Sequence, residues 1–285
     1  MNFSHAVFAV LSISAVSAVQ AAPVVTAGAG DSPATIQASV DAFRASLGAL
    51  NPNVAGSFSS GRREINWDGV PDTFSSPNNL PANFFNVNSP RGVLFSTPGS
   101  GFQVSANAVN PTSTPIEFGN LNPTYPTLFE PFSPQRLFTA LGSNITDVNF
   151  FVPGSTTAAA VSAFGVVFTD VDLPAVTSLS FFGLGNNLLG TFFAPAAVGN
   201  ETLSFLGVRF NAGEQIGRVR ITSGNSPLGS NESASIDIVA MDDFIYSEPL
   251  SAVAAIPEPE TYGLLMVGLG AVAWFGRRRG RKMAH

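Results

Sequence analysis

Hydrophobic positions near the start of the chain follow a helical period. Ser32 is a natural helix N-cap, and Pro33 suits the first helical position. Apolar residues then recur three or four positions apart, at Ile36, Val40, Phe43, Leu47 and Leu50. Asn51-Pro52 ends the pattern. We therefore predict one helix within residues 23–50. With a single arginine and a single aspartate it has no basic face, so we expect it to cap the edge of a sheet.

Beyond this helix the pattern changes to short apolar runs between turns. Two weak runs, at residues 92–95 and 102–104, interrupt a stretch rich in Pro, Asn, Ser and Phe. Stronger strand patterns occupy residues 148–152, 161–171, 177–182, 188–193, 203–210, 218–222 and 236–246. Gly185-Asn186-Asn187 predicts a hairpin turn between two of them. Many short strands without alternating helices predict an all-β fold over residues 51–250, an antiparallel β-sandwich or jelly roll.

Both ends of the chain look like targeting segments. Residues 6–19 form an apolar run, and the small residues Val19 and Ala21 flank Gln20 as in a signal-peptidase site. We therefore predict a secretory signal over residues 1–22, handled by the Sec translocon and signal peptidase. The alternative is that this run is a first buried element of the fold.

The C-terminal tail has three parts. A proline-containing linker occupies residues 251–259, an apolar helix is predicted at 260–276, and a basic tail follows at 277–285. Within this helix the uninterrupted apolar stretch is residues 262–275, which would span only about 21 Å, less than the roughly 30 Å of a bilayer core. The basic residues behind it nevertheless favour a short transmembrane helix with a cytoplasmic end: Arg277, Arg278, Arg279, Arg281 and Lys282.

The order of these parts resembles a known sorting signal. Pro257, Glu258 and Pro259, followed by a short Leu/Gly-rich helix and an arginine cluster, resemble the PEP-CTERM protein-sorting signal of Gram-negative bacteria. The resemblance implies an exosortase as partner, an inner-membrane intermediate, and cleavage near Pro-Glu-Pro. The mature protein would then reach the cell surface or be secreted, often in species that make exopolysaccharide. The alternative is a permanent single-pass anchor.

Two segments of the body also resemble other exported proteins. Residues 163–172 and 241–246 are similar to segments of exported bacterial β-sandwich proteins with no established activity. The resemblance implies a jelly-roll body like that of carbohydrate-binding modules.

Composition removes several kinds of chemistry from residues 23–256. The two histidines are His5 and His285, the one lysine is Lys282, and the chain has no cysteine. This body therefore lacks the side chains for a Ser-His-Asp or Cys-His site, and we expect no transition-metal site and no catalytic residue. Its eight arginines against seventeen acids give a net charge of −9, so we expect no nucleic-acid partner.

Two groups of residues remain as candidate sites. Asp170 with Asp172, and Asp242 with Asp243, are candidate ligands of a structural calcium ion, because carboxylates on one face of a strand suit that ion. The alternative is that these acids make ordinary turn or cap hydrogen bonds at strand ends.

Trp67, with Asp68 beside it, is the second candidate, as a glycan-binding pair. Its alternative is a core tryptophan next to an Arg–Glu surface pair.

We therefore expect an exported cell-surface or extracellular-matrix protein whose β-sandwich body is not an enzyme and binds polysaccharide. One alternative is a carboxylate-dependent glycoside hydrolase, which needs two acids roughly 5–9.5 Å apart across a cleft. The other is a purely structural or adhesive protein that associates through its sheet edges.

Overall fold

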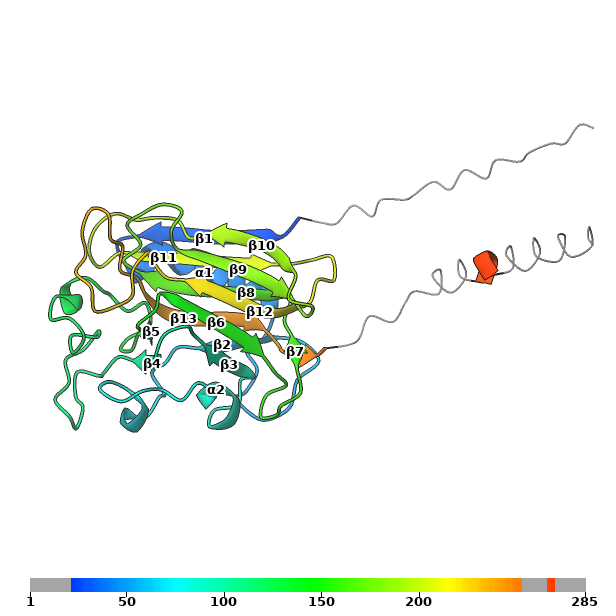
Figure 1. The fold of residues 1–285 in the computed structure, drawn as a ribbon, viewed down its shortest axis with the longest axis horizontal. Helices are drawn as coiled ribbons and strands as arrows, with labels where there is room; N and C mark the ends of the chain where they lie inside the picture. Colours follow the sequence, from blue (N-terminus) through cyan, green and yellow to red (C-terminus); the bar gives the residue numbers. More distant parts are fainter. Residues whose placement is uncertain (1–21, 253–265, 270–285) are drawn as a thin grey trace, which may run out of the picture.

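The computed structural model describes residues 22–252 and 266–269 (Figure 1). All but the last residue of the predicted signal peptide, most of the linker, and the basic tail lie outside the described residues. Of the predicted membrane helix only residues 266–269 are described, and these are helical and exposed. Within the described ranges no helix is both long enough and apolar enough to cross a membrane.

The larger sheet has seven strands. Six follow the order β1-β11-β8-β13-β5-β4, and β2 also pairs with β13. All of these pairings are antiparallel. The strands are β1 (Val24–Gly30), β2 (Arg62–Ile65), β4 (Gly101–Val104), β5 (Phe138–Leu141), β8 (Ala163–Thr169), β11 (Leu203–Arg209) and β13 (Ala240–Ser247).

The smaller sheet has five strands in the order β10-β9-β12-β6-β3, again antiparallel. Its strands are β3 (Val93–Ser96), β6 (Ile145–Phe150), β9 (Ser178–Gly183), β10 (Leu188–Phe193) and β12 (Ile216–Thr222). The predicted hairpin turn connects β9 to β10, with Asn186 at a positive φ of 60°. The remaining elements are the strand pair β7 (Ala159–Ala160) and β14 (Leu250–Ser251) and the short helices α2 (Phe84–Val87), η1 (Asp72–Phe74) and η2 (Tyr125–Thr127).

One continuous hydrophobic core joins the two sheets. Phe164, Val166 and Phe168 of β8 belong to the same buried cluster as Val148 of β6 and Val219 of β12. Alternate residues of each strand supply this cluster, as the period of a strand requires. The predicted antiparallel β-sandwich is confirmed.

Helix α1 (Pro33–Leu47) covers the outer face of the larger sheet. The predicted helix is confirmed, but it packs on the face of the sheet rather than capping its edge. Phe43 lies over Gly165 and Gly207, where an added Cβ would come within 2.9 and 2.7 Å of the Phe43 ring. The two glycines therefore let the helix approach the sheet closely, and β8 is buried on both faces.

Residues 23–50 do not form a separate helical segment. Strand β1, which the hydrophobic pattern did not predict, pairs with β11 along all seven of its residues. Strands β2 and β5, each of four residues, were missed as well.

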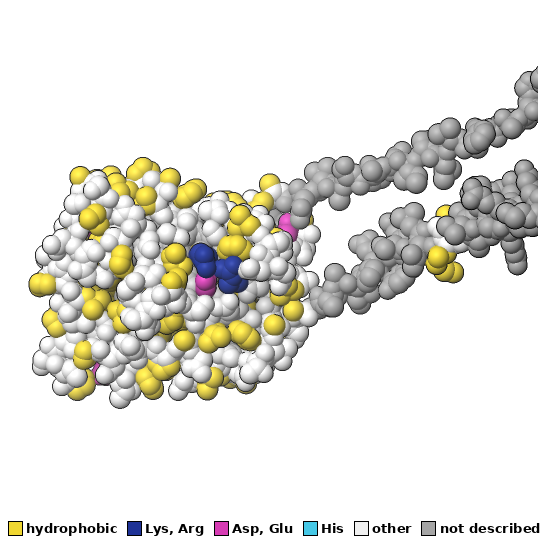
Figure 2. Space-filling model, in the orientation of Figure 1, with side chains coloured by type: hydrophobic (Ala, Val, Ile, Leu, Met, Phe, Trp, Pro, Cys, Tyr) yellow, Lys and Arg dark blue, Asp and Glu magenta, His cyan; other side chains and the backbone are white. Residues whose placement is uncertain are grey.

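Figure 2 shows the face of the molecule seen in Figure 1, where most side chains are uncharged and the charged ones gather mainly in one small group. On the smaller sheet, Arg218 and Arg220 of β12 both form ion pairs with Asp147 of β6, at 2.7 and 2.8 Å.

Candidate functional site

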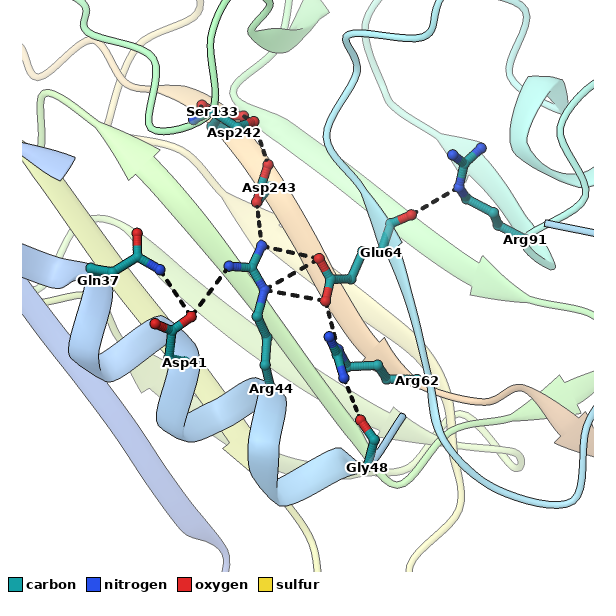
Figure 3. A network of polar contacts seen from close by, with 10 residues as sticks. All are labelled: Gln37, Asp41, Arg44, Gly48, Arg62, Glu64, Arg91, Ser133, Asp242 and Asp243. Carbon is teal, nitrogen blue, oxygen red and sulfur yellow. Dashed lines mark hydrogen bonds and ion pairs between the residues drawn. The ribbon is translucent and has the colours of Figure 1, made fainter. Parts of the chain in front are cut away.

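An extensive polar network surrounds Arg44, near the C-terminal end of α1 (Figure 3). Its guanidinium donates to Glu64 of β2 from Nε and Nη2, at 3.0–3.2 Å. Nη2 also donates to Oδ2 of Asp243 in β13, at 2.8 Å. Because the three residues come from α1, β2 and β13, the network exists only once the helix has packed on the sheet. We call Arg44, Glu64, Asp242, Asp243 and Ser133 the arginine network.

A register shift in β13 places two consecutive acids on the same side of the sheet. The pairing of β13 with β8 is irregular between Met241 and Phe244. Without that irregularity Asp242 and Asp243 would point to opposite faces. Instead, Ser133 Oγ contacts Oδ1 of both, at 3.2 and 2.7 Å.

These two acids were predicted as calcium ligands, and the structure corrects that prediction. Oδ2 of Asp242 accepts the peptide N–H groups of Phe132 and Ser133 at 2.6 and 3.0 Å. Asp243 faces the positive charge of Arg44, which would repel a cation. The alternative, that these acids make hydrogen bonds to the protein itself, is the one observed.

Burial dominates the electrostatics of this network. It raises the pKa of Asp242 well above its ordinary value, and the neighbouring Asp243 adds to the shift. Burial also raises the pKa of Asp243, although hydrogen bonding to Ser133 and the charge of Arg44 oppose it. For Arg44, burial lowers the pKa, but Glu64, Asp243 and Asp41 outweigh burial and raise it above its ordinary value.

A pocket of about 550 Å³ opens beside the arginine network. This volume lies in the ordinary range for small-molecule sites. Four side-chain amides, two arginines and two carboxylates take part in its lining, with one ring and a few small or apolar groups. The lining residues are Gln37, Arg44, Leu50, Asn51, Asn53, Glu64, Asn66, Arg91, Phe132, Ser133, Pro134 and Asp243.

Trp67 lies inside the sandwich core, so the predicted sugar platform is wrong. The side chain is 1% exposed and stacks on Phe138 with 4.1 Å between ring centroids. Its indole N–H donates to the carbonyl of Asp242 at 2.9 Å. Trp67 is therefore a core residue, as in the alternative, but the nearby Arg62–Glu64 pair, at 2.6 Å, is only 16–17% exposed and is not a surface pair.

Asp68, the predicted partner of Trp67, has a structural contact instead. Its Oδ1 accepts the peptide N–H groups of Gln135 and Arg136 at 2.7 and 3.2 Å. Burial raises the pKa of Asp68, although these two hydrogen bonds act against the shift.

The other predicted acids, Asp170 and Asp172, lie just beyond β8 and gather with Glu232. One carboxylate oxygen from each of the three lies within 4.8 Å of the others. Glu232 comes from the long connection between β12 and β13 and was not predicted, because nothing in its sequence surroundings relates it to Asp170. We call these three residues the acidic cluster.

A comparison with protein families gives one match, over residues 255–280. This segment is a PEP-CTERM protein-sorting motif. It contains the predicted Pro257-Glu258-Pro259 and the arginines 277–279, while Arg281 and Lys282 follow directly after it. A comparison with curated proteins finds no match.

The PEP-CTERM motif begins three residues after the described body ends at residue 252. Such motifs mark exported proteins that an exosortase sorts through a membrane-anchored intermediate. The motif therefore accounts for the C-terminal tail, and the β-sandwich is the part of the chain that remains to be assigned a role.

Proposed function

We propose that this chain is an exported cell-surface or matrix protein whose β-sandwich binds polysaccharide without cleaving it. The sorting motif at residues 255–280 supports the export and the exosortase as processing partner. The predicted secretory signal supports entry through the Sec translocon and removal of residues 1–22 by signal peptidase. Cleavage near Pro257-Glu258-Pro259 would then release the body or attach it to the surface.

The observation that carries the ligand assignment is the pocket beside the arginine network. Sugars expose hydroxyl groups that both donate and accept hydrogen bonds, so their sites need amides and charged groups held in fixed positions. The exposed side chains of Gln37, Asn53 and Asn66 supply amides to this pocket. Arg44 and Arg91 add guanidinium donors that suit hydroxyl or acidic sugar groups.

The same pocket argues against hydrolysis. A glycoside hydrolase needs one carboxyl group that gives a proton and a second that acts as a base or nucleophile. The acids that line the pocket are Glu64 and Asp243, and both contact the guanidinium of Arg44. Both acids are already held by Arg44, at 3.0 and 2.8 Å, so neither is free to reach a glycosidic bond, and the pair suits binding better than catalysis.

Binding is tested with the full-length protein and the exopolysaccharide of its own producer, by calorimetry. We expect binding, and an affinity at least tenfold weaker for Gln37→Ala and Asn66→Ala, because each removes an amide from the pocket. Both side chains are exposed, so the variants should keep the wild-type melting temperature.

Asn211→Ala is the matched control, since Asn211 is an exposed amide that does not line the pocket. Equal loss in this control would show that the pocket is not the site. An absence of binding to the exopolysaccharide would contradict the proposal and favour a purely structural protein. New reducing ends during the incubation would contradict it in favour of a hydrolase.

A further inference from the structure

The acidic cluster brings three carboxyl groups together, with no arginine of the described residues paired to any of them. Asp170, Asp172 and Glu232 each offer a carboxylate oxygen within 4.8 Å of the other two. None of the ion pairs among the described residues includes any of the three. Like charges at this separation repel strongly where water is scarce, so the arrangement calls for a counter-charge.

Asp170 adds an independent observation that points to a ligand. Its side chain is 0% exposed, and among the described residues both of its buried carboxylate oxygens lack a hydrogen-bond donor from outside the cluster. Oε1 of Glu232 is in the same situation. Buried polar atoms in proteins nearly always have a partner, because leaving one unsatisfied costs about 1–3 kcal/mol, and more when the group is charged.

The backbone holds the cluster in place. Asp170 has a left-handed backbone with φ 69°, and its N–H donates to the carbonyl of Thr202 at 2.8 Å. Oδ1 of Asp172 accepts the N–H of Gly199 at 2.7 Å. A strained backbone that the surrounding structure maintains is common where side chains must be aimed at a site.

Asp237 holds the backbone of the acidic cluster at Asp172 and Leu173. Its two oxygens accept the N–H groups of Asp172 and Leu173 at 3.1 and 3.3 Å. Its own N–H donates to Asn225 Oδ1 at 2.9 Å. Asp237 therefore fixes the chain at Asp172 with oxygens that already have partners, and it is a positioning residue rather than a ligand.

We propose that Asp170, Asp172 and Glu232 bind one calcium ion. Carboxylate oxygens are hard ligands, and the absence of histidine and cysteine from the body removes the ligands that transition metals favour. Calcium takes six to eight oxygens in flexible geometry, so these three carboxylates from two loops would be completed by water or peptide carbonyls. Magnesium demands near-ideal octahedral geometry and gives up its water reluctantly, so a buried ligand such as Asp170 favours calcium.

A bound ion would hold two connections together, and the Gly199–Asp172 hydrogen bond ties a third to them. Asp170 and Asp172 lie between β8 and β9, Gly199 lies between β10 and β11, and Glu232 lies between β12 and β13. The inference concerns the stability of the body and is independent of polysaccharide binding at the pocket.

The test uses the full-length protein stripped with a chelator and then titrated with calcium chloride, by calorimetry and by thermal melting. We expect one ion per chain and a rise in melting temperature of roughly 5–10 °C at a hundredfold excess of free ion over its Kd. Asp170→Asn and Glu232→Gln keep the side-chain shapes and should abolish both responses.

Asp31→Asn is the matched control, because Asp31 is an exposed acid outside the cluster, and it should respond like the wild type. If Asp170→Asn fails to fold, Glu232→Gln in the partly exposed loop carries the test. Three outcomes would overturn the proposal: no heat and no change in melting with calcium, a response to magnesium but not calcium, or an undiminished response in Asp170→Asn and Glu232→Gln.

Discussion

The arginine network and the acidic cluster both contain buried carboxylates, but they balance charge in opposite ways. In the network, Arg44 lies against Glu64 and Asp243, and peptide N–H groups and Ser133 bind Asp242. In the cluster, both oxygens of Asp170 lack a hydrogen-bond donor from outside the cluster among the described residues. The comparison teaches that an acidic pair in a sequence says little by itself. What the fold places opposite the pair decides whether it is structural or open to a cation.

Removing the cation from the network should have the largest effect. Arg44→Met keeps the aliphatic stem but leaves Asp243, 2% exposed, without its counter-charge. We expect a loss of about 3 kcal/mol in the free energy of unfolding, since an uncompensated buried charge is strongly destabilising. Urea denaturation at pH 7 measures this loss.

Arg220→Met is the matched control in an exposed ion pair. Arg220 is 41% exposed and shares Asp147 with Arg218, so its loss should cost under about 1 kcal/mol. In the cluster, Asp170→Asn without calcium should not lower stability, because the substitution removes like-charge repulsion and no cation is lost there. Equal costs for Arg44→Met and Arg220→Met would refute the contrast between a buried and an exposed counter-charge.

Acid should remove the stability that comes from carboxylates paired with arginine, such as Asp147. Burial alone would raise the pKa of Asp147, but hydrogen bonds from Arg220 and Arg218 outweigh burial and lower the pKa below its ordinary value of 3.8. The stability from this group is therefore complete above about pH 4 and is lost as the pH falls through the lowered value. We expect Asp147→Asn to be less stable by about 1 kcal/mol at pH 6, with the difference from the wild type disappearing toward pH 2.5.

Melting curves of both proteins from pH 6 to pH 2.5 provide the measurement. A difference that stays constant over this range would show that the charge of Asp147 does not contribute, and that the variant acts through packing alone.

Carboxylates without an arginine partner should make the free energy of unfolding fall, rather than rise, with increasing pH. This is the smallest of the expected effects. Burial and the charges of Glu201 and Glu130 raise the pKa of Glu117 from 4.5 to about 7. The folded state then binds more protons than the unfolded state between these values, so stability falls as the pH rises from about 4.5 to 7. Glu117 is partly exposed, and solvent screening reduces the expected change to about 0.5 kcal/mol.

Glu117→Gln should flatten this part of the pH profile. Chemical denaturation at pH 5 and pH 7.5 compares the two proteins. A variant that keeps the full slope of the wild type would assign it to other groups.

Local patterns in the sequence, the helical spacing of apolar residues and a turn motif, predicted two of the main elements correctly. Helix α1 was predicted from five apolar positions, and the hairpin between β9 and β10 from the Gly-Asn-Asn turn. Strand β1 was missed because four of its seven residues are glycine or alanine, and backbone pairing with β11 rather than its side chains stabilises it. The position of α1 on the face of the sheet depends on Gly165 and Gly207, which admit Phe43.

Candidate sites were harder to predict because their members are distant in sequence. The sorting motif was found correctly, since its parts are consecutive in the chain. Trp67 was assigned to a sugar site because tryptophan suits both a sugar and a core, and only its 1% exposure decides between them. Glu232 is sixty residues from Asp172, so no local spacing could have joined them.

The sequence by itself determined the sorting address, the all-β class, and the absence of histidine, lysine and cysteine from the body. These properties depend on consecutive residues or on composition, and folding does not change them. The tertiary structure alone decided which acids meet Arg44 and which meet only one another. A charge interacts strongly only within a few ångströms where water is excluded, and the packing of α1 and the loops on the sheets sets those distances.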